Sequence, residues 1–117
     1  MESTYSTQFL NKKVTVTIDR PMGTKHPKHN YFYPVNYGFI KGVPAPDGSD
    51  LDAYVLGVFK PVEIFDGICI AVVHRLDDDD DKLIVVPEGT EFTDEQIRAV
   101  TDFQERFFKS HILRYTK

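Results

Sequence analysis

Several residue types are scarce in this chain, and each scarcity excludes a class of protein. Cys69 is the only cysteine, so no disulfide can form within the chain, and its apolar neighbours at 68–73 indicate a buried small side chain in a reducing compartment. No apolar run approaches the ~20 residues that a membrane span requires, and the first residues lack the basic and apolar segments of a secretory signal. We therefore expect a cytoplasmic protein without membrane contact.

Positive charge is scarce as well. Lys and Arg together number 14 against 18 Asp and Glu, which gives a formal charge of -4. Nucleic acids are bound by clustered basic side chains, so this balance argues against a nucleic-acid partner and suits a hard cation better. With 41% hydrophobic and 27% charged residues, the 117 residues are typical of one globular domain, which we expect to span 1–117.

Hydrophobic patterning predicts a chain made mainly of short strands. Polar and apolar residues alternate over 13–19, as in a half-buried strand. Two short strands are expected within 31–40, and another over 52–58. The apolar runs 68–73 and 82–87 predict a hairpin with an acidic connection between them.

One helix is predicted near the end of the chain. Thr93 and Gln96 have the spacing of a capping box, which marks the start of a helix. Its buried stripe is expected to consist of Ile97, Val100, Phe103, Phe107 and Phe108. About five strands without βαβ alternation then predict a mainly β (α+β) fold, a small closed five-stranded β-barrel with a C-terminal helix packed on it.

The segment 47–52, Asp47-Gly48-Ser49-Asp50-Leu51-Asp52, is the most informative stretch for chemistry. A glycine-containing turn lets several carboxylates converge, and hard divalent cations prefer such oxygen ligands. Taken alone, the segment is more typical of a solvated acidic turn, because Asp and Gly are common turn formers.

Two further motifs accompany this turn in a defined order. Tyr33-Pro34-Val35-Asn36-Tyr37-Gly38 precedes it, and Asp80-Asp81-Lys82 followed by Val85-Val86-Pro87 comes after it. From about Val14 to Pro87 the chain resembles the soluble inorganic pyrophosphatases of the OB-barrel type, family I. The resemblance implies an OB-like barrel that hydrolyses pyrophosphate with Mg²⁺, or with Mn²⁺ in its place, and it is compatible with a homo-oligomer.

The same resemblance implies roles for individual residues. The implied metal ligands are Asp19, Asp47, Asp52, Asp77 and Asp80. The implied catalytic residues are Asp47, Asp52, Tyr33 and Lys82, and the implied substrate contacts are Lys25, Tyr33, Lys82 and Lys109. Metal ions held by the carboxylates would neutralise pyrophosphate and acidify a water that attacks phosphorus in line, while the lysines and Tyr33 stabilise the phosphate charge.

Two departures from the family pattern support an alternative function. Ser49 stands where the family usually has a second aspartate in the turn, and Phe107 and Phe108 replace a phosphate-binding Tyr-Lys pair. The alternative is a catalytically impaired module that binds metal or phosphate without efficient turnover.

Two other hypotheses rest on single features. The aromatic density suggests an oligonucleotide-binding barrel with stacking side chains, although the acidic charge opposes it; those side chains would be Tyr31, Phe32, Tyr33, Tyr37 and Phe39. His26 and His29 have a spacing compatible with zinc, but without a cysteine or second close pair a solvated loop is the favoured interpretation.

Overall fold

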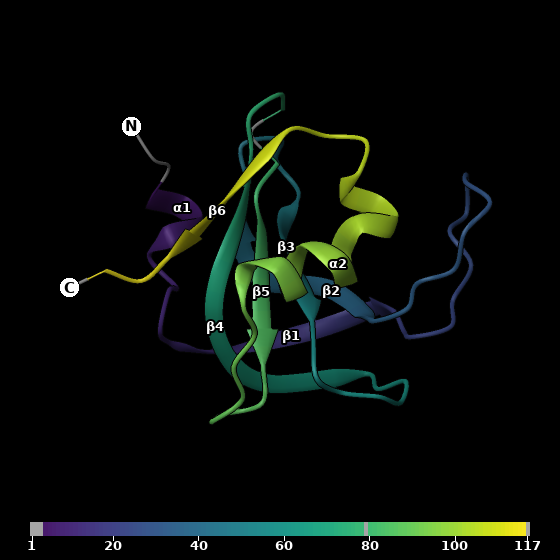
Figure 1. Ribbon diagram of the computed structural model, residues 1–117, viewed down its shortest axis with the longest axis horizontal. Coiled ribbons are helices and arrows are strands. Elements are labelled where there is room, and N and C mark those ends of the chain that lie inside the picture. The colour runs from purple at the N-terminus through teal and green to yellow at the C-terminus, as the bar shows by residue number, and fades with distance from the viewer. Residues whose placement is uncertain (1–3, 79, 117) are drawn as a thin grey trace.

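The computed structural model describes residues 4–78 and 80–116, and its strands close into a barrel beside one long helix (Figure 1). In chain order the elements are α1 (Thr4–Thr7), β1 (Lys13–Arg20), β2 (Asn36–Pro44), β3 (Asp50–Val55), β4 (Ile64–Arg75), β5 (Lys82–Val86), α2 (Asp94–Glu105) and β6 (Ser110–Arg114).

The barrel contains five strands, and a sixth is attached outside it. The strand order is β1-β2-β3-β5-β4-β6, and an additional pairing of β1 with β4 closes the first five into a ring. All pairs are antiparallel except β3 and β5, which are parallel. The predicted five-stranded barrel with a C-terminal helix is confirmed, as is the hairpin of β4 and β5, whereas β6 was not predicted.

Strand β4 closes the barrel because different parts of it pair with different strands. Its first part pairs with β1 over 64–68. From Ile68 it pairs with β5, with a register shift between Cys69 and Ala71, and from Ala71 it also pairs with β6. Such a shift bends a strand and increases its twist, which lets one strand turn the corner of a small barrel.

The segment 21–35 between β1 and β2, coloured blue in Figure 1, extends away from the barrel. It doubles back on itself through backbone hydrogen bonds, from Gly23 N to Tyr33 O and from Tyr33 N to Thr24 O. Only one of the two strands predicted within 31–40 is therefore present, since the residues before Asn36 bond within this loop instead of joining the sheet.

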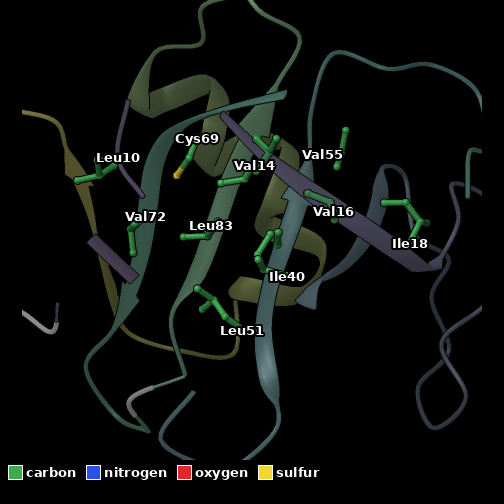
Figure 2. Packing of buried hydrophobic residues seen from close by; sticks show 12 residues of the cluster. Leu10, Val14, Val16, Ile18, Ile40, Leu51, Val55, Cys69, Val72 and Leu83 are labelled. Atoms are coloured by element: carbon green, nitrogen blue, oxygen red, sulfur yellow. The ribbon is translucent and has the colours of Figure 1, made fainter. Parts of the chain in front are cut away.

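The core confirms the alternation predicted in the first strand. Val14, Val16 and Ile18 are buried inside the barrel in a cluster that also holds Cys69, which is a free thiol (Figure 2). A second cluster lies under helix α2 and includes Ile97. At a typical ~1.5–3 kcal/mol for each fully buried aliphatic side chain, these clusters are the main favourable contribution to folding.

Helix α2 begins as predicted and ends earlier than predicted. Thr93 Oγ1 accepts from Gln96 N while Gln96 Oε1 accepts from Thr93 N, so the capping box is confirmed. The helix stops at Glu105, and Phe107 beyond it is 66% exposed. The prediction that Phe107 belongs to the buried stripe is therefore wrong. No helix in the described part of the chain is long and apolar enough to cross a membrane.

Candidate functional site

A pocket of about 610 Å³ lies between the barrel, the 21–35 loop and the C-terminal end of α2. One part of its lining is charged and the other part is aromatic. The charged residues are Asp19, Arg20, Asp52, Arg75, Asp80 and Lys82; the ring-bearing residues are His26, His29, Tyr31, Tyr33, Tyr37, Phe107 and Phe108; Gln104 completes the lining.

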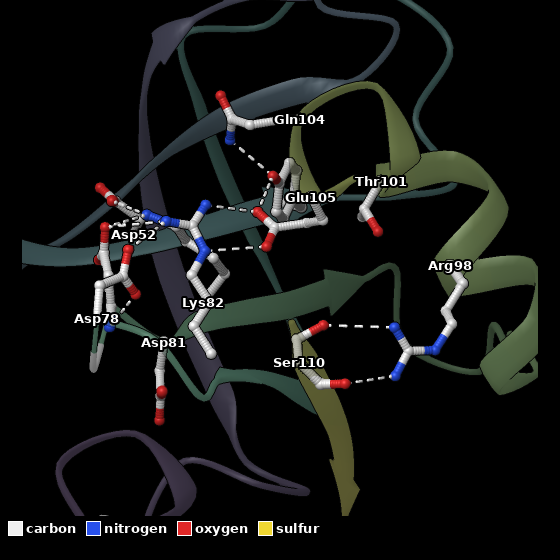
Figure 3. A network of polar contacts seen from close by, with 12 residues as sticks. Asp52, Asp78, Asp81, Lys82, Arg98, Thr101, Gln104, Glu105 and Ser110 are labelled. Carbon is white, nitrogen blue, oxygen red and sulfur yellow. Dashed lines mark hydrogen bonds and ion pairs between the residues drawn. The ribbon is translucent and has the colours of Figure 1, made fainter. Parts of the chain in front are cut away.

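Lys82 lies at the centre of the charged part. The parallel pairing of β3 with β5 places it directly beside Asp52, and its Nζ lies 2.5 Å from Asp52 Oδ2. The same Nζ lies 3.0 Å from Asp80 Oδ2, so one ammonium group joins carboxylates from two separate segments. Figure 3 shows Lys82 and Asp52 in this polar network. Lys82 is buried, which strengthens both interactions relative to those on an open surface.

Arg75, at the end of β4, is a second buried cation of the pocket. Its Nε donates to Glu105 Oε1 at 3.0 Å and its Nη2 donates to Glu105 Oε2 at 2.8 Å, a bidentate ion pair that ties the barrel to α2. Its Nη1 reaches Asp78 and Asp80 at 3.2 and 3.4 Å. The guanidinium also lies over the Phe108 ring, 3.6 Å from its centroid.

A chain of hydrogen bonds connects the aromatic part to the same ion pair. Tyr33 Oη and Tyr31 Oη both donate to Gln104 Oε1, at 2.9 and 3.2 Å. Gln104 Nε2 donates to Tyr54 Oη, which in turn donates to Glu105 Oε2 at 2.6 Å. The last turn of α2 therefore positions both sides of the pocket.

The N-terminal segment supports the site from outside the pocket. Asp81, between the two pocket residues 80 and 82, is fully buried and accepts from Ser6 Oγ at 2.6 Å through one oxygen. Its other oxygen is 2.9 Å from His74 Nδ1, and its backbone N donates to Tyr5 Oη. These contacts fix the backbone on which the neighbouring pocket side chains stand.

Burial shifts the pKa of several pocket residues. It raises the pKa of Asp80, an effect that Lys82 opposes, and it raises the pKa of Asp19 with Arg20 opposing. Burial also raises the pKa of the Tyr33 phenol to about 12, so this group is neutral over the physiological range.

Five of the residues that sequence motifs had singled out line this pocket, and four do not. Asp19, Tyr33, Asp52, Asp80 and Lys82 are among the lining residues. Asp47, Asp77, Lys25 and Lys109 are exposed and outside the lining.

Local hydrogen bonds explain where two of these acids lie. Asp47 Oδ1 accepts from Ser49 N within its own turn, and Asp77 Oδ2 accepts from Lys109 N. The acidic turn and the 77–82 loop thus meet at the pocket through Asp52 and Asp80.

Several pocket residues carry no motif that singles them out. Arg75 had a signal in the sequence, because it is a cation two residues beyond the apolar run 68–73, and Gln104 had none. His26 and His29 lie in the 21–35 loop, as expected, with His29 exposed, and both also line the pocket. Within 4–78 and 80–116, no group of three or more His, Cys, Asp or Glu side chains is arranged to hold a metal ion.

Comparisons with known proteins agree on one family. A family model described as inorganic pyrophosphatase matches residues 4–116. The inorganic pyrophosphatase of Aeropyrum pernix is 29% identical over 93 residues, which cover 76% of this chain and 50% of that protein. The enzyme of that name from Pseudomonas aeruginosa is 38% identical over 74 residues, 60% of this chain and 39% of that protein. The chain therefore spans half or less of the length of these relatives.

Solved structures show the same fold. The inorganic pyrophosphatase of Ehrlichia chaffeensis superposes with a TM-score of 0.67 at 20% identity, covering 87% of this chain and 85% of that one. The inorganic pyrophosphatase of Thermus thermophilus gives a TM-score of 0.64 at 18% identity, covering 87% and 82%. At this level of identity the likeness concerns the fold.

Proposed function

Because this chain belongs to the inorganic pyrophosphatase family, we propose that its pocket binds pyrophosphate together with Mg²⁺, or Mn²⁺, and hydrolyses it to two phosphate ions. One observation carries the proposal: Asp52 and Asp80, from separate segments of the chain, share the Lys82 ammonium inside a pocket that Asp19 and Tyr33 also line. Acids and cations placed together in this way are what metal-assisted phosphoryl transfer requires.

The donor set fits a hard cation. Asp52 and Asp80 already hold one positive group between them, the Lys82 ammonium. Mg²⁺ is commonly held by one or two carboxylates, with water and substrate phosphate completing its six ligands. A magnesium site therefore does not require three protein side chains around the ion. Asp52 and Asp80 would hold the ion, with Asp19 as a further ligand. When bound, the ion supplies charge neutralisation and a more acidic water.

The cationic side chains bind and orient the substrate. Lys82 Nζ and Arg75 Nη1 both face carboxylates now and would donate to phosphate oxygens in the complex. Hydrolysis forms a bond from water oxygen to one phosphorus and breaks the bond from that phosphorus to the bridging oxygen, which leaves on the second phosphate. Tyr33 would contribute a neutral donor by exchanging its Gln104 partner for a phosphate oxygen.

A second candidate function is binding without efficient turnover. It is favoured by the position of Asp47, which is exposed and bonded within its own turn, and by the hydroxyl of Ser49 in that turn. With these two positions unable to contribute a carboxylate to the pocket, activation of the attacking water falls to Asp19, Asp52 and Asp80.

Phosphate release from pyrophosphate at saturating Mg²⁺ separates the two candidates. We expect Asp52→Asn to lower kcat/KM by about 100-fold or more, since it removes charge at the reacting group. Asp102→Asn is the matched control, because Asp102 is an exposed acid on α2 that does not line the pocket. If the unaltered protein releases phosphate no faster than Asp52→Asn, hydrolysis is excluded, and calorimetry with pyrophosphate then tests binding alone.

A further inference from the structure

The pocket is built for more than an inorganic anion. Half of its fourteen lining residues carry rings, and pyrophosphate offers nothing to stack on them. Resting on the proposed function, we infer that the ligand class extends to diphosphate esters of an aromatic group, specifically nucleoside diphosphates. The diphosphate would lie at the charged end and the base at the ring-lined end.

The rings form one continuous wall. His26 lies nearly parallel to Tyr33, with planes 9° apart and centroids 6.0 Å apart, and His29 lies nearly parallel to Tyr31, with planes 12° apart and centroids 5.8 Å apart. The two histidine rings are themselves 4.6 Å apart. Tyr31 is held from behind by Phe103, edge to face at 5.6 Å. Such a wall is a stacking platform for a heteroaromatic ring.

Part of the wall is open to solvent, although Tyr33 within it is buried. His29 is exposed, and Phe107, which follows helix α2, is 66% exposed while it lines the pocket. A large exposed apolar ring beside a polar pocket is typical of a ligand site. Lys28 N and His29 N both donate to His26 Nδ1, which favours the neutral ring, and burial, followed by the charges of His29 and Arg20, lowers the pKa of His26.

The wall and the cations are connected by contact. Lys82 Nζ lies 5.8 Å from the centroid of the Tyr37 ring, and Tyr37 lies 5.4 Å from Tyr33, which adjoins the histidine rings. A diphosphate held by Lys82 and Arg75 would therefore direct its ester group along the tyrosines toward His26. The pocket volume of about 610 Å³ is within the ~300–1,000 Å³ typical of pockets that enclose organic ligands.

The same chemistry applies to this ligand. Water oxygen forms a bond to the terminal phosphorus, and the bond from that phosphorus to the bridging oxygen breaks. The nucleoside monophosphate leaves with the bridging oxygen, phosphate is released, and one proton passes to solvent. Water is the only co-reactant, as in pyrophosphate hydrolysis.

Calorimetry at saturating Mg²⁺ tests the inference with two ligands, ADP and ribose 5-diphosphate, which lacks the base, each with a methylene group in place of the bridging oxygen so that neither is hydrolysed during the titration. We expect ADP to bind about tenfold more tightly than ribose 5-diphosphate, as one stacked base typically contributes. His29→Ala and Phe107→Ala should each reduce that ratio several-fold. Phe32→Ala is the matched control, since Phe32 is 62% exposed in the same loop and does not line the pocket.

The outcomes separate this inference from the proposed function. Equal affinity for ADP and ribose 5-diphosphate overturns the inference, as does a ratio that His29→Ala and Phe107→Ala leave unchanged. Phosphate release from pyrophosphate is scored separately and decides hydrolysis. Tight, ring-dependent ADP binding without release of phosphate from either compound supports the ligand class and refutes the hydrolase.

Discussion

Replacing Glu105 by leucine would test how the pocket is held together. Glu105 is buried and accepts hydrogen bonds from Nε and Nη2 of Arg75, and it also accepts a hydrogen bond from the Tyr54 hydroxyl. Glu105→Leu leaves a buried cation without its principal counter-charge and leaves Tyr54 without its acceptor.

The expected loss of stability follows from this geometry. Removing one partner of a buried ion pair typically costs about 3–5 kcal/mol. Arg75 keeps weaker contacts to Asp78 and Asp80 at 3.2 and 3.4 Å, so the low end applies, about 3 kcal/mol. For a domain of this size, that corresponds to a melting temperature roughly 12 °C lower.

A double variant makes the test specific. Arg75→Leu combined with Glu105→Leu replaces the pair by apolar side chains, and such replacements are often nearly neutral. We therefore expect the double variant to be more stable than Glu105→Leu alone in urea denaturation, with an unchanged m value. A Glu105→Leu variant within about 1 kcal/mol of the unaltered protein, or strict additivity of the two changes, would refute the reasoning.

Three further predictions concern the barrel, Tyr33 and the metal. A Cβ at Gly38 would lie 1.9 Å from Thr17 O, so Gly38→Ala should destabilise the barrel by about 3 kcal/mol or more in the same urea assay. A change under about 0.5 kcal/mol would contradict the close contact between the two strands. Because burial raises the Tyr33 pKa to about 12, the contribution of the neutral Tyr33 phenol to stability is complete below pH ~10 and is lost as the pH rises toward 12. Ultraviolet difference titration against Tyr33→Phe should show no ionisation of Tyr33 at pH 10. Ionisation near pH 10 would refute the prediction. Saturating Mg²⁺ should raise the melting temperature of the unaltered protein and not that of Asp52→Asn, and equal shifts would exclude Asp52 as a ligand.

The parts of the fold that could be predicted are those decided locally. Alternation over 13–19 fixes which side of β1 is buried, and the side chains of Thr93 and Gln96 mark the start of α2 within one turn. The β4–β5 hairpin also follows from two adjacent apolar runs. Each of these elements is determined by residues close together in the sequence.

The parts that escaped prediction depend on contacts between distant segments. The parallel β3–β5 pairing and the attachment of β6 to β4 are set by closure of the barrel, which no local pattern encodes. The candidate site divides in the same way. Asp52 enters the pocket because its strand lies beside Lys82, whereas Asp47, five residues earlier, satisfies its carboxylate within its own turn.

The buried hydrogen bond from Ser6 to Asp81 joins residues 75 positions apart. It makes the first helix a support for the segment that carries Asp80 and Lys82, although that helix contributes no side chain to the pocket lining. Loss of the Ser6 hydroxyl would therefore disturb the pocket from a residue that lies outside its lining.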